Sequence, residues 1–451
     1  MLLHCVWFVV TESNMNKQQL NISQTSGSEV TEKIRSGLDK RYRSERRFQM
    51  FGFGSILLGL LALIFLFFSI VSKGYSAFQQ TYVQLSIVLE ESVLDSEGTN
   101  NKETLRNLDY GSIVKASIRG EFPEVTKRRD KRALYSLLSP SSAYYLRDTV
   151  LSDPSLIGSK IELWFPADDD IDMLNKGHID RSVPESQRRV TDQQIAWIDK
   201  LTSEGRVKKR FNWIFFNSGD SREPELAGIG GALVGSLLTL IVTLLLSFPV
   251  GMATAIYLEE FAPKNRWTDL IEININNLAA VPSIVFGLLG LAVFLNFFHL
   301  PRSAPIVGGL VLTLMTLPVV IIAGRAALQS VPPSIREAAL SMGASRVQAT
   351  FDHILPLAVP GMLTGTIIGM SRALGETAPL LMIGMVAFIV DIPGSFTDPS
   401  TALPVQIYLW LDSPERAFVE KSSAAIMVLL LFLITMNSLA VFLRSKFEQR
   451  W

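Results

Sequence analysis

The sequence predicts an all-α polytopic membrane protein with six transmembrane helices and an α+β insert outside the membrane. Three observations lead to this fold class. Apolar residues make up 48% of the 451 residues, whereas charged residues make up only 19%. The apolar residues are concentrated in runs of about 20 residues or more, the length of helix that crosses about 30 Å of hydrocarbon. One long polar stretch separates the first of these runs from the rest.

The six runs divide the chain into a first span, a polar domain and a block of five spans. The first run, 51–72, carries no charge, and the others follow the polar stretch of 73–227. They cover 228–258, 270–298, 304–327, 357–390 and 423–443. The run 357–390 is too long for one helix and predicts a span with an irregular or re-entrant segment. We therefore expect a basic tail (1–50), a first transmembrane helix (51–72), an outer domain (73–227), a five-helix domain (228–443) and a short tail (444–451).

The positions of Lys and Arg predict the orientation of the chain. They crowd before the first run, lie between the second and third runs and between the fourth and fifth, and follow the last run. The segment 391–421 instead carries five acidic residues against two basic ones. Both termini are therefore expected in the cytoplasm, with 73–227 outside. Met1–Val10 is apolar but too short to span, and Met15 is an alternative start of the chain.

The outer domain has weak patterns of both secondary structures. Tyr82–Val88 alternates as a strand does, and 130–138 and 192–201 have helical character, which predicts a small α+β domain. Asp168–Asp170 with Asp172 lack the Gly and the final Glu of a calcium loop, so we expect a solvated acidic turn.

Several classes of function are disfavoured by composition. Acidic and basic residues number 42 each, so no net charge favours nucleic acid as a partner. The sequence contains no Gly-Lys dipeptide and hence no nucleotide-binding loop of the Walker A type. One Cys and four scattered His residues leave little for a metal site. We expect no catalytic residue, no metal and no cofactor on this chain.

The segment between the fourth and fifth runs predicts a pair of short helices at the membrane surface. Pro332 and Pro333 lie where a helix can begin, and Gly343 can end it with a positive φ. A second helix is expected at 344–351. An apolar stripe on the first helix would consist of Ile335, Ala338, Ala339 and Met342. This periodicity suits docking into another protein and lying on lipid about equally.

The same segment resembles a known family. Glu337, Ala338, Ala339, Gly343 and Pro356 (within Ile354-x-Pro) match the EAA signature of ABC importer permeases. In that family the loop, here 329–356, rests on the ATPase subunit, so the resemblance implies a type I permease fold and an ATPase partner that binds the ATP.

Two further stretches, 276–287 and 371–380, resemble the PstA-type permeases of phosphate importers, and 73–227 resembles the extra outer domain of a long subgroup. The resemblance implies import of inorganic phosphate across a bacterial inner membrane. It also implies a PstC-type sister permease, PstB-type ATPase subunits and a PstS-type extracytoplasmic binding protein as partners, besides membrane lipid.

The fifth run has a face on which glycines and charges meet. On a helical wheel Gly361, Gly365, Gly369, Arg372 and Glu376 fall within about 80°. Glycines four residues apart allow another helix to approach closely, and charges inside a membrane face protein or water. Arg372 and Glu376 could form a structural ion pair, or Arg372 could present its guanidinium to an oxyanion in transit.

The resemblance favours the second role and implies that Arg372, Glu376 and Thr377 line the substrate pathway. Gly375 could break the helix before Glu376 and invalidate its position on the wheel. Other functions also remain open from the sequence: import of molybdate or sulfate, secondary transport driven by an ion gradient, or a transport-inactive sensor.

Overall fold

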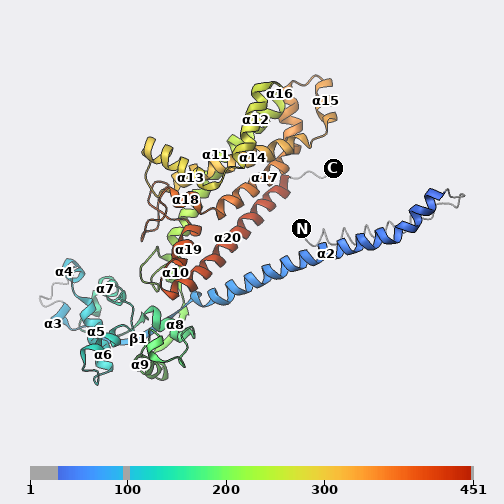
Figure 1. Ribbon diagram of the computed structural model, residues 1–451. Helices are drawn as coiled ribbons and strands as arrows, with labels where there is room; N and C mark the ends of the chain where they lie inside the picture. Colours follow the sequence, from blue (N-terminus) through green and yellow to red (C-terminus); the bar gives the residue numbers. More distant parts are fainter. Residues whose placement is uncertain (1–28, 95–101, 448–451) are drawn as a thin grey trace. The chain divides into compact units, whose positions relative to one another are not determined.

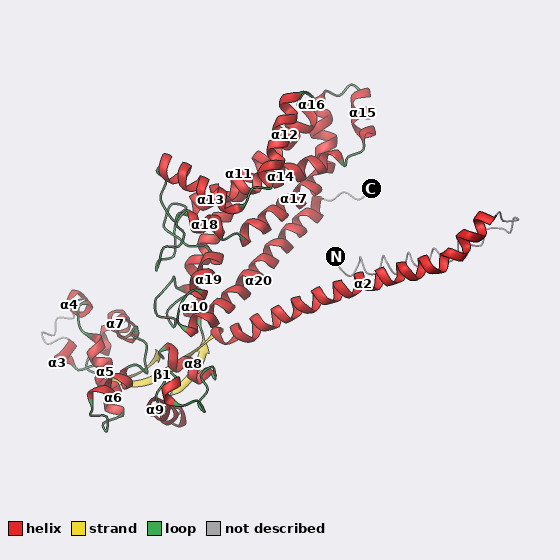
Figure 2. Cartoon of the chain, viewed as in Figure 1, coloured by secondary structure: helices red, strands yellow, loops and turns green. Residues whose placement is uncertain are grey.

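The computed structural model describes residues 29–94 and 102–447. Figure 2 shows helix through most of the chain and strands in one small region, which confirms the predicted fold class. The chain divides into two compact units, 1–69 and 70–451. Met1–Val10 and Met15 lie outside the described residues.

The first unit is dominated by one helix. α2 (Glu29–Gly74) is 46 residues long and includes the predicted first span. It contains no proline, so nothing in its sequence interrupts the backbone hydrogen bonds. In the most apolar 18-residue stretch of this helix, no residue is buried against the rest of the chain. A surface of this kind needs lipid or another protein around it.

The outer domain is built on a three-stranded antiparallel sheet with the order β2-β1-β3. The strands are β1 (Gln79–Val88), β2 (Lys160–Pro166) and β3 (Val207–Phe211). The prediction of a strand at Tyr82–Val88 is confirmed, and its alternation buries Val83, Leu85 and Ile87 completely. The chain enters the sheet at Gln79 and leaves it at Phe211, and these two residues are partners across β1 and β3.

Helices cover this sheet and complete a separate hydrophobic core. The predicted helices at 130–138 and 192–201 correspond to α6 (Arg128–Tyr135) and α9 (Asp192–Ser203). The others are α3 (Glu91–Leu94), α4 (Lys102–Arg106), α5 (Tyr110–Glu121), α7 (Ser142–Ser152) and α8 (Asp169–Lys176). α10 (Trp213–Asn217) follows the sheet, and its Phe215 belongs to a different core, with Trp410 and Phe418.

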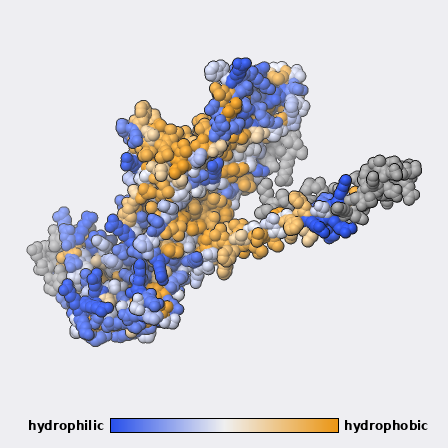
Figure 3. All heavy atoms as spheres, in the orientation of Figure 1, coloured by the Kyte–Doolittle hydropathy of each residue, from blue (hydrophilic) through white to orange (hydrophobic). Residues whose placement is uncertain are grey.

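The remaining helices form the apolar part of the second unit, which is predominantly hydrophobic in Figure 3, whereas the outer domain is hydrophilic. They are α11 (Gly230–Ile256), α12 (Arg266–Ala279), α13 (Ser283–Gly290), α14 (Pro305–Gln329), α15 (Pro333–Ser341), α16 (Arg346–Gln348), α17 (Leu355–Gly375), α18 (Ala378–Met382), α19 (Leu403–Leu411) and α20 (Arg416–Phe447). α14 contacts both α11 and α17, and α17 runs beside α20 (Figure 1). α14 is the most buried candidate span, with 61% of its apolar window inside the chain.

Five helices among the described residues are long and apolar enough to cross a membrane, or six with one bent pair. The bent pair corrects the prediction of a simple span at 270–298. α12 and α13 meet at an angle of 101° around Pro282. Proline removes a backbone donor and disfavours helix in the residue before it, so the helix stops here and starts again in a new direction.

Candidate functional site

The glycine face of α17 lies against α14. A Cβ atom at Gly361 would be 2.8 Å from the Cβ of Ala327, and one at Gly365 would overlap the Cβ of Ala323. Gly369 has more room, since its nearest neighbour would be Val320 Cγ2 at 3.7 Å. The backbones of α14 and α17 therefore approach too closely at 361 and 365 for any side chain larger than hydrogen.

Arg372, Glu376 and Thr377 lie together where α17 ends. Arg372 Nε is 3.4 Å from Glu376 Oε1, and the two side chains are 47% and 19% exposed. α17 ends at Gly375, and Glu376 has an extended backbone with φ −79° and ψ 122°. The wheel position predicted for Glu376 is therefore wrong, because the helix does not reach it. The pair still forms, since one residue of extended chain keeps the carboxylate within reach.

Thr377 begins the next short helix after this break. Its carbonyl accepts a hydrogen bond from the Leu381 amide at 3.0 Å, and α18 starts at Ala378. The run 357–390 thus consists of a long helix, a break and a short helix, followed by irregular chain. The roles of Arg372, Glu376 and Thr377 in a pathway stay a prediction.

The loop between α14 and α17 contains α15 and α16. α15 is followed by Gly343, whose φ of +90° lies in the left-handed region that glycine adopts without strain. α16 begins at a capping box formed by Ser345 and Gln348 and continues through a π-helical turn at Ala349–Ile354 into α17. Pro356 is the second residue of α17 and directly follows this turn.

The four residues of the apolar stripe predicted on α15 do not share one environment, because two are buried or partly buried and two are exposed. Ile335 is partly buried and Ala339 is 2% exposed, and α15 packs on the turn 349–354. Ala338 is exposed and Met342 is 78% exposed, because the turn covers only one edge of this short helix. Glu337 is exposed as well. The outward surface of the loop therefore combines a carboxylate with apolar side chains.

An ion network that the sequence analysis missed attaches this loop to neighbouring helices. Arg336 of α15 binds both carboxylate oxygens of Glu260, which lies in the π-helical turn that ends α11. Arg325 of α14 bridges Glu272 of α12 at 2.7 Å and Glu259 at 3.4 Å. The only signal in the sequence is an acidic pair, 259–260, at the end of an apolar run. The arginines that bind this pair are 66 and 76 residues away in the chain.

A second charged cluster joins the outer domain to α20. Lys176 of α8 forms ion pairs with Asp172 at 2.7 Å and with Glu420 of α20 at 3.1 Å. Lys421 donates to the Ala227 carbonyl at 2.7 Å. Asp172 is 8% exposed. The acidic turn predicted to be solvated is therefore partly buried, because the outer domain packs on the end of a transmembrane helix.

Burial perturbs the titration of carboxylates in this cluster. It raises the pKa of Glu225, in the segment before α11, to about 7. It also raises the pKa of Asp168 to about 8, with a further contribution from the neighbouring charge of Asp169. Desolvation disfavours the charged form of each acid.

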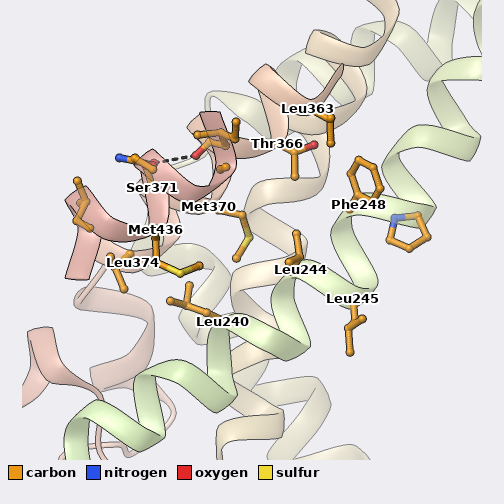
Figure 4. Close-up of a pocket in the computed structure, with 15 residues that line it drawn as sticks. Leu240, Leu244, Leu245, Phe248, Leu363, Thr366, Met370, Ser371, Leu374 and Met436 are labelled. Atoms are coloured by element: carbon orange, nitrogen blue, oxygen red, sulfur yellow. Dashed lines mark hydrogen bonds between the residues drawn. The ribbon is translucent and has the colours of Figure 1, made fainter. Parts of the chain in front are cut away.

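A cavity of about 360 Å³ lies among α11, α17 and α20. Figure 4 shows its apolar walls, with Phe248 of α11 and Met370 of α17 among them. The dashed line marks the hydrogen bond from Ser371 Oγ to Asn437 Oδ1, 2.5 Å long. Arg372 does not line this cavity, so the apolar space and the predicted pathway residues are separate features.

Comparison with known proteins gives matches to both halves of the chain. A family described as binding-protein-dependent transport system inner membrane component matches 247–451, and a domain of unknown function (DUF3333) matches 35–185. Phosphate transport system permease protein PstA 1 of Mycobacterium tuberculosis is 31% identical over 232 residues, which are 51% of this chain and 75% of that protein.

Two further proteins are similar over smaller or more distant matches. The probable ABC transporter permease protein YqgI of Bacillus subtilis is 37% identical over 155 residues, 34% of this chain and 52% of that protein. Among solved structures, a chain of the MetNI methionine ABC transporter in an inward-facing conformation superimposes with a TM-score of 0.40 and 19% identity. That match covers 48% of this chain and 97% of the other.

Proposed function

This chain belongs to the PstA family of phosphate transport system permease proteins, and from that premise we propose that it is a membrane subunit of an ATP-driven importer of inorganic phosphate. The observation that carries the proposal is the identity to PstA 1 over 75% of that relative. The fold supports it, because the exposed loop and the candidate spans that follow α11 lie within 247–451, the region that the transporter family matches. The importer would also contain a sister permease, two ATPase subunits and an extracytoplasmic binding protein.

The loop around α15 is the surface that we assign to the ATPase. Glu337 and Met342 are exposed on it, and a mixed surface of this kind suits a protein partner that buries it. Arg336 and its bond to Glu260 tie α15 to the end of α11, so α15 cannot move far without displacing that helix. Closure of the ATPases on ATP would thus be transmitted to the transmembrane helices.

Arg372 is the residue that we assign to the phosphate pathway. Its guanidinium is about half exposed and is held by Glu376 in a single, long contact. A guanidinium with free donors binds a phosphate oxyanion through paired hydrogen bonds. Glu376 would occupy the guanidinium when the path is empty and would limit how tightly an anion is held, which speeds release.

The test is ATP-dependent uptake of labelled phosphate in proteoliposomes that contain the four kinds of subunit. We expect uptake that needs ATP and that excess molybdate or sulfate does not inhibit. Uptake of molybdate or sulfate in place of phosphate would identify that anion as the substrate, and uptake without the ATPase would indicate a secondary transporter. Phosphate-dependent signalling without uptake would indicate a sensor.

The pathway role is tested separately with Arg372→Gln. We expect this variant to abolish uptake while the complex assembles and hydrolyses ATP. Arg302→Gln removes another exposed arginine, from the segment before α14, and should transport normally. Normal uptake by Arg372→Gln would remove Arg372 from the pathway.

A further inference from the structure

A small cavity lies where the outer domain meets α20. Its volume is about 10 Å³, which is room for one water-sized particle. Four carboxylates and two ammonium groups line it, which gives the wall a formal charge of −2. The carboxylates are those of Asp169, Asp172, Glu225 and Glu420, and the ammonium groups are those of Lys176 and Lys421.

Both ammonium groups of the wall are already engaged. Lys176 is bound between Asp172 and Glu420, so these three charges form one cluster. Lys421 donates to a backbone carbonyl and forms no ion pair with Glu225 within the described part of the chain. Asp169 and Glu225 therefore face the cavity without a cationic partner.

The cavity also holds buried acceptors that lack a donor. Both carboxylate oxygens of Glu225 and the side-chain oxygen of Gln80 are buried without a hydrogen-bond partner among the described residues. Glu225 is 3% exposed and Gln80 1% exposed, so bulk water does not reach them. The Ser139 hydroxyl lies near Glu225 and is 2.9 Å from Ser141 Oγ, and either hydroxyl of that pair can be the donor. Leaving such groups unsatisfied is costly, and these three lack a donor or a cation.

Additional carboxylates flank this cavity. The side chains of Asp168, Asp169 and Asp170 each offer an oxygen within 4.8 Å of the others, and all three are partly buried. Asp169 belongs to this group and to the wall of the cavity, so it connects the two. Glu415, just before α20, adds a buried oxygen without a partner in the described residues.

We propose that this cavity binds one divalent cation, Ca²⁺, between Asp169 and Glu225. The side-chain oxygen of Gln80 would be the third ligand from this wall. A charge of +2 balances the wall, and a cation would satisfy the buried oxygens of Glu225 and Gln80, which have no hydrogen-bond partner within the described residues. All groups on offer are oxygens, which hard cations prefer, and no sulfur or imidazole ligand lines the cavity in the described residues.

The geometry favours Ca²⁺ over Mg²⁺. Ca²⁺ accepts six to eight oxygens in irregular arrangements, whereas Mg²⁺ requires a near-ideal octahedron. Here the ligands come from three separate parts of the chain, namely a helix start, a strand and the turn before α11, and the adaptable coordination of Ca²⁺ suits such a set. The bound ion would cross-link α8 and the segment before α11 beside the Lys176–Glu420 pair, and so fasten the outer domain to the transmembrane part.

The test is equilibrium dialysis of the purified full-length chain in detergent with radioactive Ca²⁺, after removal of divalent ions with a chelator. We expect one saturable Ca²⁺ per chain, with a dissociation constant on the order of 0.1–1 mM, the range of extracellular calcium modules. Mg²⁺ should compete at least tenfold less well. Thermal unfolding should shift upwards with Ca²⁺ in the same concentration range.

Two variants and a control locate the ion. Glu225→Gln and Asp169→Asn should each weaken Ca²⁺ binding at least tenfold. Asp169→Asn changes a partly exposed residue, so it keeps the test valid if Glu225→Gln folds poorly. Glu124→Gln removes an exposed carboxylate elsewhere in the outer domain and should bind Ca²⁺ as the parent does. The absence of saturable binding would mean that water or a proton satisfies Glu225. Equal binding by all variants would mean that Ca²⁺ binds only adventitiously at surface sites. Either result would overturn the proposal.

Discussion

Arg336→Gln should uncouple the loop at α15 from α11, and by more than Glu260→Gln does. The Arg336 guanidinium holds Glu260 through Nε at 3.1 Å and Nη2 at 2.5 Å. The Glu260 side chain is 6% exposed and that of Arg336 is 37% exposed. Removal of the guanidinium leaves a nearly buried carboxylate unpaired, whereas removal of the carboxylate charge leaves a guanidinium that water reaches.

The exposure of the two side chains sets the size of the effect. Breaking a fully buried pair costs about 3–5 kcal/mol, and an exposed pair contributes about 1 kcal/mol or less. This pair lies between these limits, so we expect about 2 kcal/mol for Arg336→Gln and about 1 kcal/mol for Glu260→Gln. Since 1.4 kcal/mol is a factor of ten, the equilibrium constant for holding α15 against the end of α11 should fall roughly thirtyfold in Arg336→Gln and about fivefold in Glu260→Gln.

The assay is phosphate uptake per ATP hydrolysed by the reconstituted importer. Arg336→Gln should lower this ratio strongly, and the double variant should perform better than the sum of the two single effects predicts, because it leaves no unpaired charge. Arg266→Gln, an exposed arginine at the start of α12, is the matched control. An unchanged ratio in Arg336→Gln, or strictly additive effects in the double variant, would show that this ion pair does not couple α15 to α11.

Three further predictions concern single features of the fold. Gly365→Ala should destabilise the chain by about 1–3 kcal/mol through overlap with Ala323, whereas Gly375→Ala, which meets nothing within 4 Å, should not; thermal unfolding in detergent compares them. Gly343→Ala should destabilise the native conformation of the loop by about 1 kcal/mol, because the φ of Gly343 is +90°, and should thereby lower coupled transport. Gly343→Asn should have a smaller effect, because Asn tolerates left-handed backbone. The hydrogen bond from Arg206 lowers the pKa of Glu121 below its usual value of 4.5. The ionised carboxylate therefore stabilises the outer domain fully at pH values above 4.5, and this stabilisation is lost as the pH falls through the lowered pKa. Unfolding of Glu121→Gln measured from pH 3 to pH 7 should lack that part of the pH dependence, and an unchanged profile would contradict it.

The sequence predicted features that depend on local composition or on helical periodicity. Apolar runs located the spans because the length of a spanning helix is set by the thickness of the bilayer. The wheel placed Gly361 and Gly365 together on one face, and that face lies against α14. Gly343 was expected to end a helix because few other residues adopt positive φ, and its φ is +90°.

Features that depend on tertiary structure were missed. The run 270–298 was predicted as one span, but α12 and α13 meet at 101°, an angle that is decided by what the two helices pack against. Arg336 and Glu260 are 76 residues apart, and nothing local to either one selects the other as partner. The burial of Asp172 follows from the contact between the outer domain and α20, which hydropathy along the chain does not report.

The pairing of Gln79 with Phe211 bears on how this chain could have acquired its outer domain. The two ends of the domain lie side by side, so the gap left by its removal is the width of one strand pair, about 5 Å. A single genetic insertion or deletion at this point could add or remove the whole domain as a cassette, with no rearrangement of the helices on either side. Natural permeases with and without such a domain can therefore share one membrane architecture, and a foreign domain with adjacent ends could be grafted at the same position.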